Sequence, residues 1–579
     1  ASVRGTEVRE EILPPERDIT GEPPRVGVFV CHCGKNIGGI VNVPSVAEYA
    51  KDLPNVVFAM DNLYTCSSDA QEVIKEHIQE HELNRVIVAS CSPRTHEPLF
   101  QQTLREAGLN PHLFEMANIR DQCSWVHMHE KEAATYKAKD LVRMAVAKAN
   151  LIEPLKPIPL QVRQEGLVVG GGVAGMTGAL ALADQGFQVY LVEKSDRLGG
   201  NALKVEDTLT GEKVGPFVTG LKERVENHPK IELFLNSRLT HVDGFIGNFV
   251  STLEIGGNGS GPSDREIEHG IILVATGGKE SVPGEYLYGK SDKVKTLLEL
   301  NREIKEGTFE APETAVFIQC VGSREPDHPY CSRICCAGAI KNALLIKRKR
   351  PDAQVFVVYR DIRTYGFKEE YYNLARELGI TFVRYDVDRK PAVTEKNGEL
   401  SVAVADPVLQ AELVIQPDLL VLSSRIDPNP DNEVLSQFFK VPLTAEKFFL
   451  EAHVKLKPVE FATDGIYVAG LAHYPKDLDE VASQAMAAAG RATTVLSSES
   501  LEAAGLVSYV NEARCSACGA CVTVCAYNAI EIDEERGVAV INEALCKGCG
   551  ACAATCRGSA INLKGFKDEQ ILNVLNTVI

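Results

Sequence analysis

The chain has 579 residues, of which 45% are hydrophobic and 24% charged, so it is long enough for several soluble domains. A formal charge of −18 argues against nucleic acid or an anionic membrane surface as a partner, and no apolar run has the length of a transmembrane segment. The unusual feature is the seventeen cysteines. Their number is odd and most are closely spaced, which favours metal ligation over disulfides.

Residues 1–24 are polar and are expected to form an N-terminal extension. Residues 25–150 alternate between apolar strand patterns and helical patterns, which predicts an α/β domain, and a Pro-rich linker follows at 151–164. Cysteines lie at four successive predicted strand ends, where ligand sites of such sheets gather. The pattern predicts an iron–sulfur cluster, with Cys31 as a surplus thiol or a substitute, on Cys33, Cys66, Cys91 and Cys123.

The segment 165–500 opens with a dinucleotide-binding pattern. An apolar strand runs into Gly170, Gly172 and Gly175, a helix follows, and a second strand ends at Glu193. The glycines allow a tight turn and close approach of a pyrophosphate, and the helix N-terminus favours the phosphates. The acid is placed to bind a ribose diol.

Three later stretches favour FAD as the dinucleotide. EKSDRLGG contains the acid, IILVATGG forms a strand, and TDGIYVAG forms another strand before a helix. Together they resemble the FAD-domain fingerprints of the thioredoxin reductase and glutathione reductase superfamily, a Rossmann-like α/β fold. The further candidate cofactor-binding residues are Lys194, Gly199, Gly200, Asn201, Thr276, Gly277, Gly470, Ser483, Gln484 and Ala485. By the resemblance, the last four lie against the isoalloxazine ring.

One position departs from that superfamily pattern, which has aspartate after the last glycine. This chain has Leu471 there. Lys476 or Asp477 is a candidate to supply the missing contact, and the alternative for Lys476 is a solvated loop lysine.

Residues 311–390 have the β-α-β rhythm of a nucleotide-binding subdomain, but no GxGxxG loop opens it. Instead, CVGSREPDHPYCSRICCAGA places one cysteine at the predicted strand end and three before the predicted helix, namely Cys320, Cys331, Cys335 and Cys336. A redox disulfide would favour a C-x-x-C spacing, which this stretch lacks, and zinc is an alternative ligand of four thiolates. An iron–sulfur cluster fits best beside a flavin and a ferredoxin module.

The segment 501–579 contains C-x2-C-x2-C-x3-C twice, 31 residues apart. This is the bacterial two-cluster ferredoxin pattern, in which each fourth cysteine binds the other cluster. One [4Fe–4S] cluster is expected on Cys515, Cys518, Cys521 and Cys556, and the other on Cys546, Cys549, Cys552 and Cys525. The last residues, GFKDEQILNVLNTVI, predict an amphipathic helix that packs on its own chain or docks a partner.

In chain order, CHCGKNI, ASCSPRTHEPLF, FEMANIRDQCSW, the flavin stretches, QCVGSR…YCSRICC and the tandem ferredoxin resemble the A subunit of heterodisulfide reductase. The resemblance covers nearly the whole chain from about residue 25. It implies a cytoplasmic FAD and iron–sulfur oxidoreductase, usually a homodimer. The implied partners are the B and C subunits of heterodisulfide reductase, ferredoxin, and an input module such as a hydrogenase, a formate dehydrogenase or an NADH-oxidising unit.

The cysteine groups and the resemblance together predict one FAD and four [4Fe–4S] clusters. The implied activity is flavin-based electron bifurcation or confurcation between ferredoxin and a heterodisulfide-type acceptor, with no catalytic side chain because FAD is the reactive centre. Two alternatives are an NAD(P)H-dependent flavin reductase, which the missing nucleotide loop disfavours, and a passive electron relay.

Overall fold

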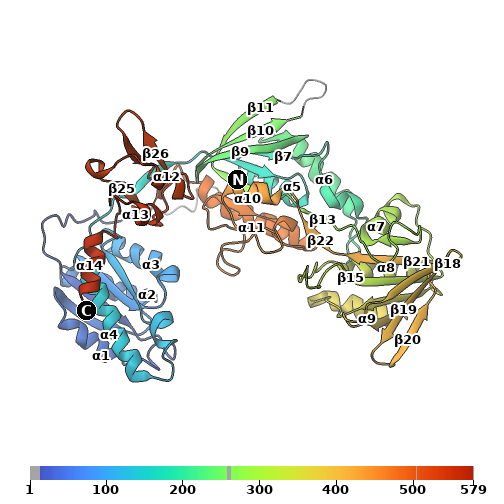
Figure 1. The fold of residues 1–579 in the computed structure, drawn as a ribbon, viewed down its shortest axis with the longest axis horizontal. Coiled ribbons are helices and arrows are strands. Elements are labelled where there is room, and N and C mark those ends of the chain that lie inside the picture. The colour runs from blue at the N-terminus through green and yellow to red at the C-terminus, as the bar shows by residue number, and fades with distance from the viewer. Residues whose placement is uncertain (1–12, 257–262, 504, 578–579) are drawn as a thin grey trace. The chain divides into compact units, whose positions relative to one another are not determined.

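The computed structural model describes residues 13–256, 263–503 and 505–577, so the first half of the predicted N-terminal extension lies outside the described residues. The chain divides into two compact units. Residues 160–501 form one, and residues 13–159 together with 502–577 form the other (Figure 1). The segments predicted as the N-terminal domain and the ferredoxin domain therefore belong to the same unit.

The N-terminal part of that unit contains a parallel sheet in the order β2-β1-β3-β4. The strands are β1 (Val26–Cys31), β2 (Val56–Asn62), β3 (Arg85–Ser90) and β4 (Phe114–Asn118). The helices are α1 (Val43–Lys51), α2 (Ser68–Glu80), α3 (Pro93–Glu106) and α4 (Lys131–Ala149). The two central strands, VGVFVC and RVIVAS, are buried along their whole length, which is why most of their residues are apolar. Ile19, before the first strand, is buried in the same core.

The ferredoxin part has two similar halves. Its antiparallel strand pairs are β25 (Ser508–Val510) with β28 (Ile561–Leu563) and β26 (Ile530–Asp533) with β27 (Val538–Ile541). Its short helices are α12 (Ala520–Val524) and α13 (Ala551–Thr555). Each helix follows a glycine in the left-handed region, Gly519 at φ 75° and Gly550 at φ 76°, so the cysteine spacing and the glycines repeat together.

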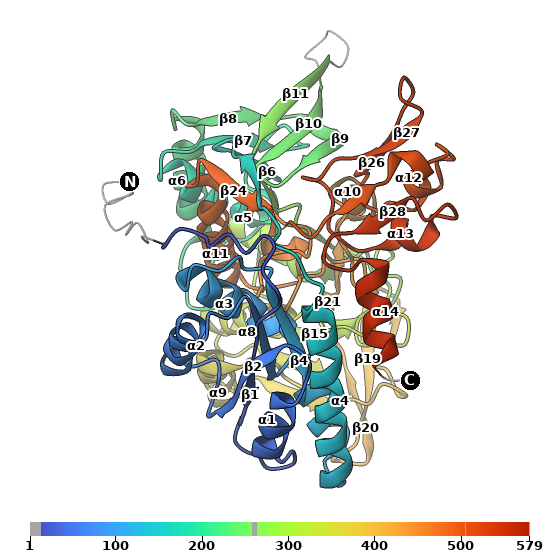
Figure 2. The same ribbon diagram turned by 90° about the vertical axis from the view of Figure 1, so that its left-hand side faces the viewer.

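The C-terminal helix α14 (Asp568–Asn576) packs against α4 of the same unit (Figure 2). Gln570 donates a hydrogen bond of 2.8 Å to the carbonyl oxygen of Leu151, and Asn573 donates one of 2.7 Å to that of Ala147. The helix thus packs on its own chain, which was one of the two expected arrangements.

The other unit contains a parallel sheet in the order β23-β12-β6-β7-β8. These strands are β6 (Glu165–Val169), β7 (Gln188–Val192), β8 (Ile231–Phe234), β12 (Ile271–Val274) and β23 (Ile466–Val468). The associated helices are α5 (Val173–Ala183), α6 (Val214–Glu226) and α11 (Leu478–Leu496), and α5 packs on α11. An antiparallel sheet is made of β9 (Ser237–Phe245), β10 (Asn248–Ile255) and β11 (Ser263–His269).

A second parallel sheet in this unit has the order β14-β21-β15-β16-β17. Its strands are β14 (Val294–Thr296), β15 (Thr314–Val321), β16 (Gln354–Tyr359), β17 (Thr381–Arg384) and β21 (Leu419–Ser424). The helices are α7 (Leu297–Glu306), α8 (Cys335–Lys349), α9 (Glu369–Glu377) and, after the sheet, α10 (Asn432–Phe439). An outer antiparallel sheet contains β18 (Ala392–Lys396), β19 (Glu399–Asp406) and β20 (Ala411–Ile415).

The two parallel sheets are linked by an antiparallel pair, β13 (Gly278–Glu280) with β22 (Ile426–Pro428). One strand of the pair follows the first sheet's β12 and the other follows the second sheet's β21. Parallel sheets connected through helices confirm the predicted α/β class. Within residues 13–256, 263–503 and 505–577, no helix has the length and apolar character needed to cross a membrane.

Candidate flavin and iron–sulfur sites

The glycine loop after β6 contains two kinds of glycine. A Cβ on Gly170, where φ is 112°, would lie 2.3 Å from the carbonyl oxygen of Ala275, and one on Gly175 would lie 1.7 Å from that of Gly170. Packing of the turn therefore requires both. Gly172 caps α5, and a Cβ built there meets no atom within 4 Å. This glycine leaves open space at a helix N-terminus, which is the cradle that a pyrophosphate needs.

The stretch after β7 folds back onto the glycine loop. The N–H of Gly199 donates a hydrogen bond of 2.9 Å to the carbonyl oxygen of Gly171, and the Glu193 carboxylate accepts one of 2.6 Å from the Gly171 N–H. Asn201 donates one of 2.8 Å to the carbonyl oxygen of Gly278. The glycine loop and the stretch EKSDRLGG therefore meet the end of IILVATGG at the carboxyl end of the sheet. Glu193 lies beside the glycine loop.

The remaining cofactor candidates after β7 and β12 face the residues around α10. Thr276 Oγ1 donates a hydrogen bond of 3.0 Å to Asn432, and Lys194 Nζ lies 2.6 Å from a carboxylate oxygen of Asp431. Gly277, at φ 75°, has no atom within 4 Å of its Cβ position. Gly200 adopts φ 54°. The backbone bordering this region is thus glycine-lined and open, as close contact with a dinucleotide requires.

The stretch TDGIYVAG, which ends at Gly470, packs against the start of α5, the helix that follows the glycine loop. A Cβ on Gly470 would lie 2.8 Å from the Cβ of Ala174 in α5. The Gly470 N–H donates a hydrogen bond of 3.0 Å to the side chain of Gln484, while Ala485 is buried and Ser483 is exposed. The N-terminal half of α11 therefore lies beside the start of α5, and a dinucleotide on the glycine loop would extend along it.

Lys476 is buried, with 8% of its surface exposed, so the solvated-loop alternative does not hold. Its Nζ donates hydrogen bonds of 2.8 Å to the carbonyl oxygen of Gly470 and 2.7 Å to that of Tyr474. Burial, and next the nearby Arg333 guanidinium, lower the pKa of Lys476 to about 7. Asp477 is instead the N-cap residue of α11, and burial raises the pKa of its carboxyl group. Lys476 therefore places an amine that titrates near neutral pH against Gly470.

The four cysteines of the 320–336 loop gather at the carboxyl edge of the second parallel sheet. All are buried, and the electrostatic neighbours of the Cys335 thiol include the thiols of Cys320, Cys331 and Cys336. The structure extends β15 through Val321 and begins α8 at Cys335, so Cys335 and Cys336 lie in the first turn of the helix, not before it. A helix N-terminus stabilises a thiolate, which suits this position to a metal ligand.

Backbone strain accompanies this cysteine loop. Cys320, Arg324 and Arg333 adopt φ values of 63°, 59° and 61°, a conformation that costs a non-glycine residue on the order of 1–3 kcal/mol. Burial raises the pKa of Cys320 to about 11, so the thiol on its own stays protonated at neutral pH. The N–H of Arg333 lies 3.3 Å from the sulfur of Cys331 and donates a hydrogen bond to it. Metal binding displaces thiol protons, and the bound metal would stabilise the strained conformation of the loop.

The cysteine loop contacts the segment that follows the last flavin fingerprint, including the first turn of α11. The ring of Tyr330 lies 5.5 Å from that of Phe448 and 6.4 Å from that of Tyr474, centroid to centroid. Arg333 pairs with Glu480 of α11 at 2.9 Å. A cluster on these cysteines would therefore be adjacent to a cofactor lying along the N-terminal half of α11.

In the N-terminal sheet, electrostatic interactions link Cys31, Cys33, Cys66 and Cys91, while the Cys123 thiol forms a hydrogen bond to α4. Burial raises the pKa of Cys31, whose electrostatic neighbours include Cys33 and Cys66, and it raises that of Cys91, whose neighbours include Cys66. The thiol of Cys123 instead donates a hydrogen bond of 3.0 Å to the carbonyl oxygen of Ala134 in α4, and burial raises its pKa to about 11. The geometry thus brings Cys31 into the group and turns the Cys123 thiol toward α4.

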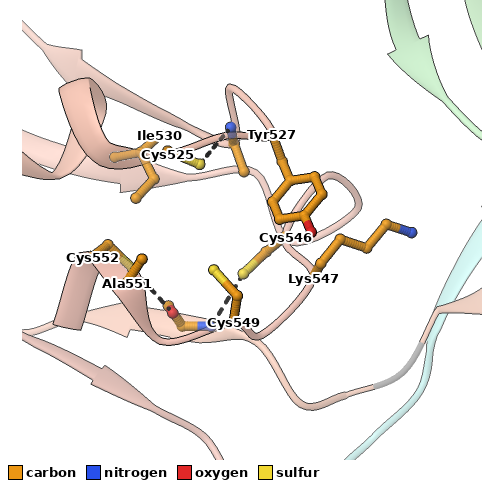
Figure 3. Close-up of a pocket in the computed structure, with 10 residues that line it drawn as sticks. Cys525, Tyr527, Ile530, Cys546, Lys547, Cys549, Ala551 and Cys552 are labelled. Carbon is orange, nitrogen blue, oxygen red and sulfur yellow. Dashed lines mark hydrogen bonds between the residues drawn. The ribbon is translucent and has the colours of Figure 1, made fainter. Parts of the chain in front are cut away.

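The second half of the ferredoxin part forms a small cavity that Cys525 lines together with Cys546, Cys549 and Cys552 (Figure 3). These are the four ligands predicted for one cluster, including the cysteine contributed by the other repeat. Backbone N–H groups donate to the sulfurs of Cys525 and Cys546 at 3.3 Å and 3.4 Å. Such hydrogen bonds stabilise thiolates and tune the potential of a bound cluster.

The other ferredoxin ligands follow the same arrangement. The electrostatic neighbours of Cys521 include Cys515 and Cys518. Cys556, predicted to complete this set, accepts a hydrogen bond of 3.2 Å from the N–H of Ala560. Burial acts to raise the pKa of Cys556, but backbone N–H groups, with Ala560 first, outweigh it and lower the pKa.

An open cleft of about 750 Å³, which the sequence patterns did not indicate, lies at the carboxyl ends of β16 and β17. Its lining includes three arginines and three tyrosines, namely Arg360, Arg363, Arg384, Tyr359, Tyr365 and Tyr372. The sequence feature that could have indicated the cleft is the run VVYRDIRTYG, which begins inside a predicted strand and continues with basic and aromatic residues. Guanidinium and phenol groups together suit a ligand that carries phosphate and an aromatic ring.

Fold and sites define an oxidoreductase that joins a Rossmann-type, FAD-binding fold to a ferredoxin-type domain. A family model described as an NAD(P)-binding Rossmann-like domain matches residues 168–222, and one described as a 4Fe-4S dicluster domain matches residues 514–560. The chain belongs to the A-subunit family of heterodisulfide reductases, as its curated relatives establish.

Three of these relatives are each named as an A subunit. The second iron-sulfur A subunit of the CoB–CoM heterodisulfide reductase of Methanopyrus kandleri is 39% identical over 90% of this chain and 93% of its own length. The A subunit of the H2:CoB-CoM heterodisulfide,ferredoxin reductase of Methanothermobacter thermautotrophicus is 38% identical over 90% of this chain and 92% of its own length. The iron-sulfur A subunit of the CoB–CoM heterodisulfide reductase of Methanocaldococcus jannaschii is 36% identical over 96% of this chain and 98% of its own length. Among solved structures, the thioredoxin reductase of T. acidophilum covers 58% of this chain and 98% of its own, with a TM-score of 0.40 and 14% identity.

Proposed function

We propose that the protein transfers electrons within a heterodisulfide reductase-like complex, and that it bifurcates or confurcates them between ferredoxin and a disulfide-type acceptor. The observation that carries this proposal is the buried four-cysteine loop against the segment from Gly470 to Lys476. FAD, when bound, supplies the conversion between two-electron and one-electron chemistry. The four thiolates would hold a one-electron centre where a pyridine-nucleotide reductase has its nicotinamide loop.

The residues of the chain have distinct roles in this proposal. The glycine loop and Glu193 would hold the dinucleotide, and the N-terminus of α11, whose helix dipole favours negative charge, would stabilise the reduced ring. Lys476 adds an amine whose charge changes near pH 7. Backbone N–H groups donating to Cys331, Cys525 and Cys546 set the potentials of the clusters.

The proposed partners follow from the family. The names of relatives include hydrogen, formate, reduced F420 and ferredoxin as reactants. We therefore propose that a homodimer of this chain assembles in the cytoplasm with B and C subunits and with ferredoxin. The complex would also contain an input module, which is a hydrogenase, a formate dehydrogenase or an NADH-oxidising unit.

The metal and flavin content of the purified protein tests this proposal. Four clusters of four irons and one flavin give about sixteen irons and one FAD per chain. Iron, acid-labile sulfide and flavin are measured on the same sample and divided by protein concentration from amino-acid analysis. A content of about eight irons would leave only the two ferredoxin clusters and would rule out both other cluster sites.

For the N-terminal cluster we propose Cys33, Cys66 and Cys91 as ligands, with Cys31 as the fourth, because the Cys123 thiol is directed toward α4. Cys31→Ser is then expected to lose about four irons per chain, and Cys123→Ser to retain them. Iron analysis of the two variants decides the ligand set. The reverse result would restore the set predicted from the strand ends.

The cleft beside β16 and β17 favours a second candidate, an NAD(P)H-dependent flavin reductase, because its arginines and tyrosines suit a nucleotide. Against it, the loop between β15 and α8 carries cysteines where a glycine cradle is required. Rapid mixing of the isolated holoprotein with NADH or NADPH separates the two. Direct bleaching of the flavin absorbance would favour the second candidate, and an unchanged spectrum would favour the first.

A further inference from the structure

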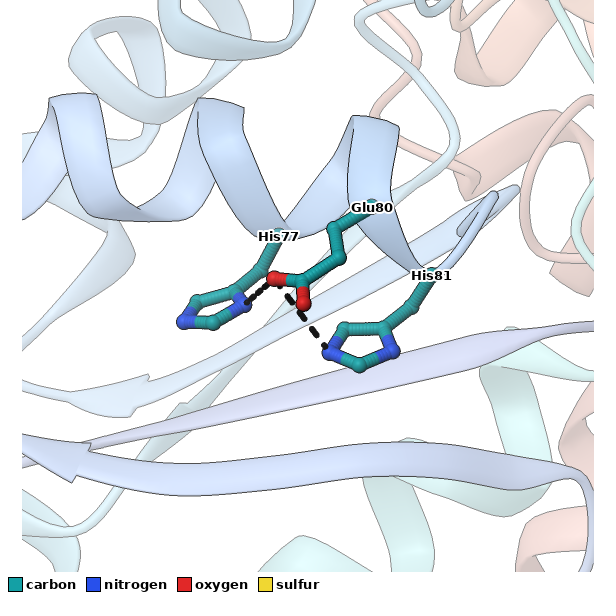
Figure 4. Close-up of side chains that lie close together, drawn as sticks. All are labelled: His77, Glu80 and His81. Carbon is teal, nitrogen blue, oxygen red and sulfur yellow. Dashed lines mark ion pairs between the residues drawn. The ribbon is translucent and has the colours of Figure 1, made fainter.

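Three potential metal ligands converge at the C-terminal end of α2. His77 and Glu80 lie in the last turn of the helix, and His81 is its C-cap residue. Positions three and four apart share one helical face. His77 Nδ1 lies 3.2 Å from Glu80 Oε2, and His81 Nε2 lies 3.9 Å from the same oxygen. One donor atom from each residue lies within 4.8 Å of the other two (Figure 4).

These separations are close to those that a zinc ion imposes. With Zn–N and Zn–O distances of about 2.0–2.2 Å and tetrahedral angles, neighbouring donor atoms lie about 3.4 Å apart. The pair formed by His77 and Glu80 already has this spacing, and His81 Nε2, at 3.9 Å from the Glu80 oxygen, would move closer to it when the ion binds. Two imidazoles and one carboxylate form a known three-ligand zinc set, which leaves the fourth position for water.

The two imidazole rings are already held in place by the sheet. Phe58 of β2 stacks on both, with its ring centroid 4.1 Å from that of His77 and 4.5 Å from that of His81. Within the described residues, His77 Nδ1 is buried and faces the Glu80 carboxylate without forming a hydrogen bond. Ligands ordered before the ion arrives lose less conformational entropy on binding it.

The group is separate from the cysteines of the same sheet. Cys66 precedes α2, whereas the two histidines end it, and a helix of 13 residues is about 20 Å long. The cysteines thus lie at the carboxyl edge of the sheet and the histidines toward its amino edge. Zinc at the histidines and iron at the cysteines are therefore separately measurable.

We propose that His77, Glu80 and His81 bind a divalent transition-metal ion, and that Zn²⁺ is the ion their ligand chemistry suits best. The ion would hold the C-terminal turn of α2 in the orientation that stacks it on Phe58. Because Zn²⁺ has no redox chemistry, it would take no part in electron transfer, and its fourth position would remain open to water.

The test is zinc binding by the iron- and flavin-loaded protein. Samples are dialysed against buffered free Zn²⁺, bound zinc is counted by mass spectrometry, and the coordination is determined by X-ray absorption at the zinc edge. The expected result is one zinc per chain with nitrogen and oxygen neighbours at about 2.0–2.1 Å. His77→Gln and His81→Gln are each expected to weaken zinc binding by about tenfold or more, with unchanged iron and flavin.

His127→Gln is the matched control, because His127 makes the same pairing with a glutamate three residues on, Glu130 at 3.1 Å, and zinc binding should be unchanged. Sulfur neighbours at about 2.3 Å would assign the zinc to cysteines and overturn the proposal. Equal zinc affinity in the double variant His77→Gln/His81→Gln would overturn it too. So would the absence of bound zinc from protein that retains its iron and flavin.

Discussion

Cys336→Ser is expected to lose about four irons per chain while keeping its flavin. Cys336 lies in the first turn of α8, is 3% exposed, and has Cys335 and Cys320 as neighbours. A serine hydroxyl does not ionise to a comparable ligand, so the remaining three thiolates no longer hold a four-iron cluster. Because this loop contacts the segment that follows the last flavin fingerprint, the loss should also slow electron transfer from the flavin to the ferredoxin clusters.

Iron and flavin analysis measures the first effect, and freeze-quench electron paramagnetic resonance of the ferredoxin clusters measures the second. Arg348→Gln provides the control, since Arg348 is an exposed residue in the last turn of the same helix, far from its cysteines. A Cys336→Ser protein with full iron content would exclude Cys336 as a ligand. Normal reduction of the ferredoxin clusters in a variant lacking the four irons would show that electrons reach these clusters without passing through this loop.

The features that sequence predicted best are those determined by short spacings. The C-x2-C-x2-C-x3-C repeats fold as two equivalent turns with left-handed glycines, because the ligand positions and the turn are encoded within a dozen residues. The loop of Gly170 and Gly175 was equally predictable, since a side chain at either position would collide with backbone atoms nearby. The α/β class followed from the alternation of apolar strands and helical patterns.

Features that depend on long-range packing were not accessible in this way. The Lys476 amine donates to carbonyl oxygens of its own loop, but its pKa is lowered by burial in the fold and by Arg333, which is far away in the sequence. Whether Cys31 or Cys123 joins the N-terminal cysteines depends on side-chain direction and on the position of α4, neither of which strand order determines. A strand-end rule places residues at an edge but does not say where their thiols point.

The start of α8 shows a related limit. Sequence placed the loop cysteines before the helix because the helical pattern, AIKNALLIKRK, begins only after them. In the structure the helix begins at Cys335 without a side-chain cap, and buried thiols occupy its first turn. The first helical turn consists of two cysteines and two small residues, so the apolar periodicity alone placed the start of the helix too late in the chain.

Lys476→Met is expected to lower the midpoint potential of the bound flavin below pH 7 and to change it little at pH 9. The pKa of Lys476 is depressed to about 7, so its amine is charged below that pH and neutral above it. A positive charge against Gly470 favours negative charge on the nearby reduced cofactor, and this contribution disappears as the pH rises through the pKa. The expected decrease is on the order of 30 mV, which corresponds to about 1.4 kcal/mol for a two-electron couple.

Spectroelectrochemical titrations of the flavin between pH 6 and pH 9 measure this difference, with Lys455→Met, at an exposed loop lysine, as the control. Lys476→Arg separates charge from packing, because a guanidinium stays charged throughout this range. The arginine variant should therefore keep the higher potential at pH 9, where the wild-type protein has lost it. Equal potentials for wild type and Lys476→Met at pH 6 would mean that the buried amine does not influence the flavin. In that case its hydrogen bonds to the carbonyl oxygens of Gly470 and Tyr474 would serve only to hold the loop.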